Sequence, residues 1–330
     1  MTAEYTGARH AIAMVNGTAA LQIALIIGGV KRGDEVITQP LTFVATANAI
    51  SHCGAKPVFI DVDLDTLGMS PEKLNDWCSK NIKINESTNQ PINKLTKRPI
   101  TAIVPVHTFG HPCRIDEIIE IANRYNIPVI EDAAESLGSF YKGKHTGTFG
   151  LAGIFSYNGN KTITTGGGGM IITNDEVFAK NARHITTTGK IPHKWEYIHD
   201  IVAYNYRLTN VSAAIGVGQM EVIDSIISNK RETARIYSEY FPLWGVKFIC
   251  EHPNAFSNYW LNAIVLENKN QKDELLQYTN SNNVMTRPIW RLMHTLDMYK
   301  SSQVGSIENA RWLYERAVNI PSSCRIMKHK

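Results

Sequence analysis

The chain has 330 residues, of which 43% are hydrophobic and 19% charged, the balance of an ordinary globular protein with a large core. Its net charge of +4 is mild; it suits an anionic small molecule and gives no sign of the basic stripe of a nucleic-acid-binding protein. The five scattered cysteines form no Cys-x-x-Cys pair, which argues against a disulfide framework or zinc ribbon and favours a cytoplasmic location. No signal peptide is recognisable, and the longest apolar run, residues 19–30, is too short to span a membrane.

Short apolar runs alternate with helical patterns over the first two thirds of the chain. Residues 116–125 carry the apolar spacing of a helix, and four runs are predicted as buried strands: 35–38, 56–61, 101–105 and 127–132. A strand, a helix and a second strand at this spacing form a parallel crossover unit. We therefore expect an α/β protein with an open, mostly parallel sheet covered by helices up to about residue 215.

The rest of the chain has a different character. Residues 222–240 predict a long charged helix, and the patterns that follow indicate a small α+β region. We expect a large domain over residues 1–220 and a smaller C-terminal domain over residues 221–330. Within the first domain, the polar, turn-rich segment 87–98 is expected to be an exposed loop.

Lys161 has the most informative surroundings in the sequence. It lies between a short apolar strand that begins near Phe155 and four successive glycines, residues 166–169. Because these flanks are typical of interior structure, an ammonium group there needs a function. A lysine amine in a partly dry site becomes a nucleophile toward carbonyls. The segment therefore predicts a Schiff base between Lys161 and an aldehyde cofactor.

Asp132 ends a predicted strand and is followed by Ala133 and Ala134. Ligands of open parallel sheets bind outside the carboxyl ends of strands, where a carboxylate can keep a ring nitrogen protonated. The two small side chains would let a flat ring lie close. The alternative is that Asp132 is a helix N-cap, the commoner role when such an aspartate is considered alone.

A phosphate site is predicted where a glycine turn opens a helix-forming run at residues 16–25. The backbone N–H groups of Thr18 and Ala19 would face outward there, and the hydroxyl of Ser156 could join them. The alternative is an ordinary capped core helix. Phe43, just after the strand at 35–38, could stack on a cofactor ring or belong to the core.

Two histidines and a cysteine, His107, His111 and Cys113, have the residue types of metal ligands. Gly110 and Pro112 exclude the helix that would bring both histidines to one face, so no metal site is predicted. We expect His107 instead to follow a strand end and to lie in the substrate cleft.

Together these segments resemble the sugar-nucleotide aminotransferases of the DegT/DnrJ/EryC1/StrS family, which use pyridoxal 5'-phosphate (PLP) on a type I aminotransferase fold. The resemblance covers essentially the whole chain. Six segments carry it in one order: Asn-Gly-Thr-Ala-Ala (16–20), Leu-Thr-Phe-Val-Ala-Thr (41–46), Pro-Val-His-Thr-Phe-Gly (105–110), Glu-Asp-Ala-Ala-Glu (131–135), Ser-Tyr-Asn-Gly-Asn-Lys (156–161) and Tyr-Asn-Tyr-Arg (204–207).

The resemblance implies roles around the cofactor ring. Lys161 would bind the PLP aldehyde and then act as general acid and base, and Asp132 would pair with the pyridinium nitrogen. Phe43 would stack on the ring, and Glu135 would lie near its 3-hydroxyl.

The resemblance also implies how the phosphate is bound. Thr18, Ala19 and Ser156 would hold it from one chain. Asn205 would reach the phosphate of the neighbouring subunit, which makes the active unit a homodimer with shared active sites.

The substrate follows from a subgroup resemblance. The insert at 87–98 and the run from Asn158 to Gly169 resemble most the enzymes of legionaminic-acid-type bacterial surface-sugar pathways, whose acceptor is a UDP-linked 4-keto-6-deoxy-N-acetylhexosamine. L-glutamate would then be the amino donor, and a 4-amino sugar for surface glycans the product. Arg287, Arg291 and His294 are candidate contacts for the nucleotide diphosphate; the alternative is a solvated surface patch.

Three alternatives remain beside this interpretation. The first alternative is a truncated, catalytically impaired PLP-fold scaffold or sugar-nucleotide-binding protein. It arises because family members usually carry several tens of residues ahead of the region that this chain reaches by residue 11. The complete pair of Lys161 and Asp132 argues against it. A related sugar dehydratase would carry histidine in place of Lys161. A nicotinamide oxidoreductase would need Gly-x-Gly-x-x-Gly after a strand, which is lacking.

Overall fold

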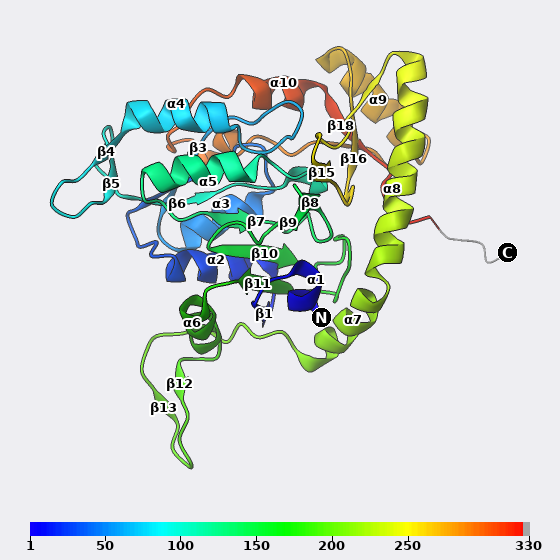
Figure 1. Cartoon of the computed structure of the whole chain (residues 1–330). Helices are drawn as coiled ribbons and strands as arrows, with labels where there is room; N and C mark the ends of the chain where they lie inside the picture. The colour runs from blue at the N-terminus through cyan, green and yellow to red at the C-terminus, as the bar shows by residue number, and fades with distance from the viewer. Residues whose placement is uncertain (326–330) are drawn as a thin grey trace.

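The computed structural model describes residues 1–325. A four-stranded and a three-stranded sheet lie edge to edge and are joined by parallel bridges between residues 103 and 129 and between 106 and 132 (Figure 1). Every neighbouring pair in this joined sheet is parallel except the two pairs that contain β11. The spatial order is β1 (His10–Met14), β11 (Gly169–Thr173), β10 (Ala152–Ser156), β7 (Ile130–Asp132), β6 (Ile100–Val104), β2 (Glu35–Thr38) and β3 (Lys56–Phe59). The expected mostly parallel sheet is thus confirmed, including all four predicted strands.

Helices cover both faces of this sheet because alternate strand residues point to opposite sides. Val36 packs into the core under α2, whereas Ile37 packs into the core under α4 and α5. The predicted helix 116–125 is confirmed as α5. The helices of this part of the chain are α1 (Thr2–Thr6), α2 (Gly17–Ile27), α3 (Val44–His52), α4 (Pro71–Asn81), α5 (Ile115–Arg124) and α6 (Glu176–Thr186).

The segment 87–98 is not a plain exposed loop, which corrects the expectation. It contributes β5 (Pro91–Asn93), which pairs antiparallel with β4 (Ile82–Ile84). The Asn93 side chain is fully buried, and its amide donates hydrogen bonds to Glu35 Oε2 at 2.6 Å and to Gln303 Oε1 at 2.5 Å. The polar composition suggested an exposed segment. Asn93, however, supplies the hydrogen bond that the buried Glu35 carboxylate needs and so holds the insert against the sheet.

The substitution Asn93→Ala should lower the free energy of unfolding by about 2–3 kcal/mol, because it leaves the buried Glu35 carboxylate without its amide donor. Urea denaturation would measure the change. Asn123→Ala, on the exposed side of α5, is the matched control and should change the value by less than about 0.5 kcal/mol. Equal effects of the two substitutions would contradict the assignment.

The C-terminal part of the chain builds a separate sheet. Its order is β14 (Lys247–Phe248), β16 (Asn262–Val265), β18 (Ala317–Ile320) and β17 (Arg287–Pro288), accompanied by α9 (Lys269–Ser281) and α10 (Glu308–Arg316). The predicted long helix is confirmed as α8 (Ile223–Tyr240). Ile223 and Ile227 pack into the core of the large sheet, whereas Ala234 packs on the C-terminal sheet. Because α8 serves both cores, the division at residues 220 and 221 remains a prediction.

Two further features lie outside these sheets. A hairpin of β12 (Lys190–Ile191) and β13 (Ile198–His199) extends well away from the body, and α7 (Asn210–Glu221) precedes α8 (Figure 1). A small sheet joins β15 (Ala255–Phe256), β8 (Phe140–Tyr141) and β9 (Lys144–His145). Within residues 1–325 no single helix is long and apolar enough to cross a membrane; only α7 together with 223–244, a pair bent by 60°, meets the criteria of length and composition.

Candidate active site

A cavity of about 320 Å³ opens beside the carboxyl ends of β7 and β10. This is the edge at which open parallel sheets bind ligands. The cavity brings together six of the predicted residues, and other residues around it come from α2, α3 and the C-terminal part of the chain. The predicted residues that line it are Thr18, Phe43, Asp132, Glu135, Ser156 and Lys161.

Asp132 is the last residue of β7 and points a nearly buried carboxylate into the cavity. Its Oδ2 accepts a hydrogen bond from the Thr46 hydroxyl at 2.7 Å, and its Oδ1 accepts from the N–H of Ala134 at 3.2 Å. No helix begins at this residue, so the N-cap alternative is excluded. A carboxylate fixed by two donors can face a cation in the cavity without moving.

Lys161 lies on the loop after β10 and has a side chain that is only 11% exposed. Its Nζ is 3.7 Å from Glu135 Oε1 and 4.0 Å from the centroid of the Trp260 ring. A carboxylate and an aromatic face both stabilise an ammonium in a place with little water. The amine is therefore held at the cavity wall, as the sequence indicated.

Glu135 is itself buried and is oriented from the other side. Its Oε2 accepts a hydrogen bond from the N–H of Phe109 at 2.7 Å. Phe109 has the left-handed φ of 59°, which is uncommon for a residue with a side chain. Burial raises the pKa of the Glu135 carboxyl to about 7; the Asp132 charge adds to this rise, and the Lys161 ammonium opposes it. Glu135 can thus gain or lose a proton near neutral pH, beside the lysine amine.

The helix α2 begins at the cavity and presents its positive end to it. Ala19 differs from the expectation, because its N–H is donated to the N-cap side chain, Asn16 Oδ1, at 2.8 Å and is not free. The first intrahelical bond is donated by Ala20, so the amides of Gly17 and Thr18 precede the helical ladder. These two amides, rather than Thr18 and Ala19, form the candidate anion site.

Ser156 completes this corner at the end of β10. A Cβ on Gly17 would lie 3.0 Å from the Ser156 Cβ, so the absence of a side chain at Gly17 allows helix and strand to approach closely. Ser156 also lines this cavity, and its contact with a phosphate remains a prediction. Two backbone amides and a hydroxyl at a helix N-terminus form a suitable cradle for a phosphate.

Phe43 stands at the mouth of the cavity with 51% of its surface exposed, which excludes the core alternative. Its ring is 6.2 Å from that of Trp290, and Trp290 packs in turn against Trp260 at 6.4 Å. The cavity thus has an aromatic wall. The sequence indicated Phe43 but neither tryptophan, because both lie beyond the last predicted cofactor segment, residues 204–207, and belong to no motif recognised there.

His107 does not contact the cavity, which corrects the expectation that it lies in the substrate cleft. Its side chain is fully buried, Nε2 lies 2.9 Å from Glu131 Oε2, and Nδ1 accepts a hydrogen bond from the N–H of Cys113. Glu131 precedes Asp132 on β7 and therefore points to the opposite side of the strand. Both ring nitrogens of His107 therefore make hydrogen bonds behind the site and are not available to a substrate.

Four other predicted residues also lie outside the lining of the cavity. Arg287 and Arg291 are exposed, and His294 is half-buried. Trp290, between the two arginines in sequence, does line the cavity. Asn205 is exposed and forms a backbone bridge with Thr187 beside the extended hairpin, and its side chain makes no hydrogen bond within residues 1–325. Direct contacts of these four with substrate or cofactor remain predictions.

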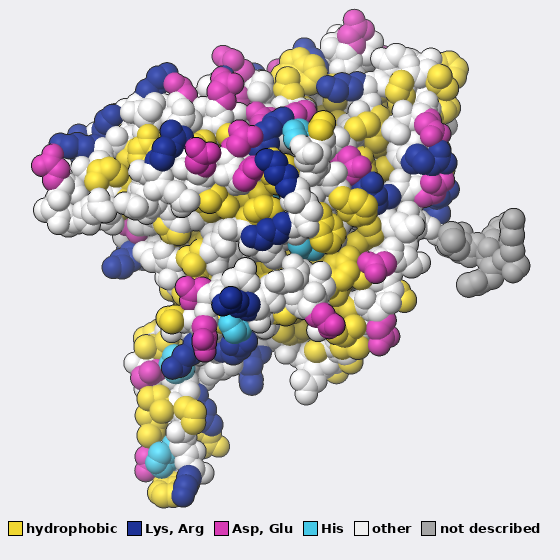
Figure 2. Space-filling model, in the orientation of Figure 1, with side chains coloured by type: hydrophobic (Ala, Val, Ile, Leu, Met, Phe, Trp, Pro, Cys, Tyr) yellow, Lys and Arg dark blue, Asp and Glu magenta, His cyan; other side chains and the backbone are white. Residues whose placement is uncertain are grey.

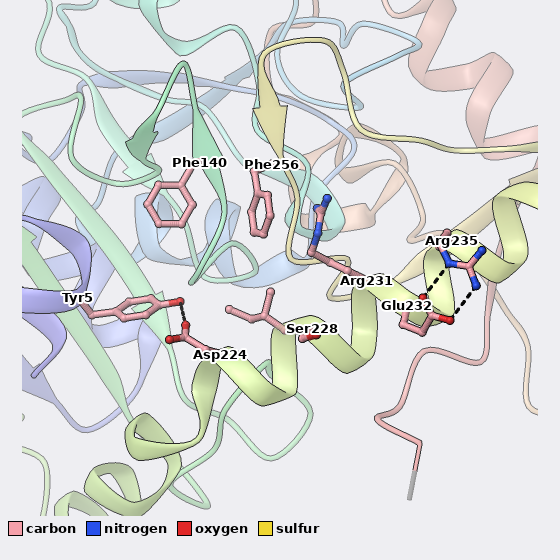
Figure 3. A pocket seen from close by; sticks show the side chains of 9 residues that line it. Tyr5, Phe140, Asp224, Ser228, Arg231, Glu232, Arg235 and Phe256 are labelled. Atoms are coloured by element: carbon pink, nitrogen blue, oxygen red, sulfur yellow. Dashed lines mark hydrogen bonds and ion pairs between the residues drawn. The ribbon is translucent and has the colours of Figure 1, made fainter. Parts of the chain in front are cut away.

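A second hollow, of about 620 Å³, runs along α8 and is shown in Figure 3. Its charged side chains already have partners in the chain. The Tyr5 hydroxyl donates to Asp224 at 3.2 Å, and Arg235 bonds to Glu232 at 2.8 Å. We assign no function to this hollow.

Comparison with known proteins identifies the chain. The model of the DegT/DnrJ/EryC1/StrS aminotransferase family matches residues 1–330. The chain belongs to this family. A GDP-perosamine synthase of Escherichia coli O157:H7 is 40% identical over 322 residues, which cover 97% of this chain and 82% of that protein. The putative pyridoxal phosphate-dependent aminotransferase EpsN of Bacillus subtilis is 38% identical over 327 residues, 97% of this chain and 80% of the relative.

The fold agrees with that of solved family members. A DegT/DnrJ/EryC1/StrS aminotransferase from Brucella abortus superimposes with a TM-score of 0.87 at 28% identity, covering 97% of this chain and 83% of that structure. The type I aminotransferase fold and the aminotransferase class expected from the sequence are therefore confirmed. The family is PLP-dependent, which confirms the cofactor.

The residues of the cavity fit PLP. An amine, Lys161, can take the aldehyde, and a fixed carboxylate, Asp132, can face a ring nitrogen. The cradle of Gly17, Thr18 and Ser156, which a Cβ on Gly17 would crowd, suits the phosphate. The cavity therefore offers a suitable group to the aldehyde, to the ring nitrogen and to the phosphate of the cofactor.

Replacing Glu135 with glutamine should flatten the dependence of stability on pH in the cofactor-free protein. The folded-state pKa of about 7 lies above the ordinary 4.5, so the folded chain binds an extra proton between these values. The stabilising contribution of Glu135 is then present at low pH and is lost as pH rises through 7. Relative to Glu135→Gln, the wild-type free energy of unfolding should fall by roughly 2–3 kcal/mol between pH 5 and pH 8.

Urea denaturation at both pH values would test this. Glu120→Gln, on the exposed side of α5, is the control and should keep the wild-type slope. Identical slopes for wild type and Glu135→Gln would show that Glu135 titrates as an ordinary surface carboxylate.

Proposed function

We propose that the chain transfers an amino group from L-glutamate to the ketone of a nucleotide-linked 4-keto-6-deoxy sugar and so forms a 4-amino sugar for bacterial surface glycans. The observation that carries this proposal is the meeting of a lysine amine, a buried aspartate and a helix N-terminus on one cavity. Membership of a sugar aminotransferase family supports it.

The cofactor, when bound, supplies an aldehyde and a cationic ring that delocalises a carbanion. The chain supplies the proton transfers. We assign Lys161 Nζ as the base that takes a proton from the donor carbon and as the acid that returns one. Asp132 keeps its charge toward the ring nitrogen, and Thr46 and Ala134 hold it in place. Glu135 is the carboxyl group nearest this base, with its Oε1 3.7 Å from Lys161 Nζ.

We infer that Gly17, Thr18 and Ser156 bind the phosphate from one chain and that Asn205 reaches it from a second. Exposed apolar surface supports a homodimer. Trp195 and Tyr197, on the hairpin, are 75% and 81% exposed, and hydrophobic side chains cluster along this arm in Figure 2. The helix α7 buries none of its residues against the rest of residues 1–325. Such surfaces are typical of subunit contacts.

The nucleotide is the finer part of the proposal. The subgroup resemblance favours UDP, whereas three relatives, 35–40% identical, carry the name GDP-perosamine synthase. We therefore propose a GDP-linked sugar as the first candidate and a UDP-linked N-acetylhexosamine as the second. A cytoplasmic location agrees with five cysteines that form no disulfide.

The holoenzyme should form 2-oxoglutarate from L-glutamate when a 4-keto-6-deoxy sugar nucleotide is supplied, and faster with the GDP-linked than with the UDP-linked ketone. Lys161→Ala should reduce the rate about 10³-fold or more, because the chain then lacks its acid and base. Mass spectrometry of the sugar product would measure amination. Turnover by Lys161→Ala, or no amination of either ketone by wild type, would refute the proposal.

Asp132→Asn provides the matched contrast, since the amide keeps the size of the side chain and loses its charge. The variant should still bind the cofactor, and the proton transfer should slow by about 10²-fold or more. Near-normal rates would remove Asp132 from the mechanism.

Mixed dimers test the shared site. When a Lys161→Ala chain is paired with an Asn205→Ala chain, one site should contain both lesions and the other neither, so about half of the wild-type activity should return. Differently tagged chains would allow the mixed dimer to be purified, with both mutant homodimers as controls. No recovery in verified mixed dimers would mean that Asn205 does not act across the interface.

A further inference from the structure

A short segment of the C-terminal part, residues 257–261, packs against loops of the large sheet next to the lysine loop. The N–H of Asn258 is donated to Ser139 Oγ at 2.9 Å, and the N–H of Leu261 is donated to the carbonyl of Phe109 at 3.2 Å. No site residue was predicted in this segment, which was assigned only to the small α+β region. The contacts instead join this segment to the loops that carry Glu135 and Lys161.

Trp260 makes two contacts with the lysine loop, a cation–π contact and a hydrogen bond. The Lys161 Nζ lies 4.0 Å from its ring centroid, and its indole Nε1–H is donated to the carbonyl of Asn160 at 2.6 Å. The first contact acts on the amine and the second on the backbone immediately before it. The indole is 95% buried, so its position is well fixed.

Asn258 fixes the position of Trp260. Its Oδ1 accepts the N–H of Trp260 at 2.8 Å, and its Nδ2 donates to the carbonyl of Glu135 at 2.9 Å and to the hydroxyl of Thr162 at 3.1 Å. A Cβ on Gly110 would lie 1.9 Å from this Oδ1, so only glycine leaves room for the asparagine. One buried side chain therefore connects the residue after Lys161, the backbone of Glu135 and Trp260.

The backbone of this segment is also constrained. Tyr259, between the asparagine and the tryptophan, has the left-handed φ of 47°. Such a conformation in a residue with a side chain persists only where the surroundings hold it, and it is concentrated at functional sites. Here the Ser257 hydroxyl accepts the N–H of Tyr259 at 3.0 Å and donates to the carbonyl of Gly110 at the same distance.

We propose that Trp260 is a positioning residue for the reaction: its ring face and its indole N–H hold the free amine of Lys161 beside Glu135, so that the amine stays in place while it is not bonded to the cofactor. This inference rests on the proposed function for its catalytic meaning. The contact itself belongs to the chain alone and can be tested without cofactor.

The test compares Trp260→Phe, which keeps a ring face and loses the N–H, with Trp260→Leu, which loses both. In cofactor-free protein, trinitrobenzenesulfonate should modify Lys161 about 3- to 10-fold faster in Trp260→Leu, because no ring covers and attracts the amine, and less than about 2-fold faster in Trp260→Phe. Peptide mass spectrometry would report the rate at this residue. Trp244→Leu, which removes an indole that is 70% exposed and does not line the cavity, should leave the rate unchanged.

In the holoenzyme, Trp260→Leu should lower kcat of the glutamate half-reaction about 10-fold with little change in KM, and Trp260→Phe should restore most of it. Wild-type labelling of Lys161 in folded Trp260→Leu, or in Trp260→Met should the leucine variant not fold, would overturn the inference. Turnover by Lys161→Ala would refute the proposed function but leave the labelling result to decide the role of Trp260.

Discussion

The site depends on holding a lysine ammonium whose side chain is only 11% exposed at the wall of the cavity. An ammonium in such a place is costly unless a charge and oriented donors or rings compensate it. Here Glu135 approaches Lys161 Nζ to 3.7 Å and the Trp260 ring to 4.0 Å. The backbone of each of these two residues is in turn held by the same asparagine, Asn258, which accepts the N–H of Trp260 and donates to the carbonyl of Glu135.

The parallel sheet makes this arrangement possible. Because β7 and β10 run side by side in the same direction, Asp132 and Ser156 end at one edge, and the loop after β10 returns Lys161 to it. The helix α2 then brings an uncompensated positive end to the same corner. Elements separated by more than a hundred residues in sequence thus supply one group each, and no single segment could form the cavity alone.

The sequence predicted those parts of the site that depend on local patterns. Lys161 and Asp132 could be recognised because each follows an apolar strand and precedes small residues. Trp260 and Asn258 could not, because their role comes only from contacts with loops about a hundred residues earlier. The amide of Ala19 was expected to be free, but an Asn16 side chain caps it, and which amide a cap takes depends on its rotamer. His107 and Asn93 were misjudged because partners distant in sequence, Glu131 and Glu35, decide whether a polar side chain is buried.

The helix α8 has a mechanical consequence. It is one unbroken rod of 18 residues whose first turns are embedded in one core and whose last turns are embedded in the other. Because α8 packs into a different core at each end, the two sheets cannot rotate apart at the junction near residue 220 as long as Ile223 and Ile227 keep their packing. Opening of the active-site cavity must therefore come from bending of α8 or from movement of the loops that carry Phe43 and Trp290. It does not come from a free hinge between the two sheets.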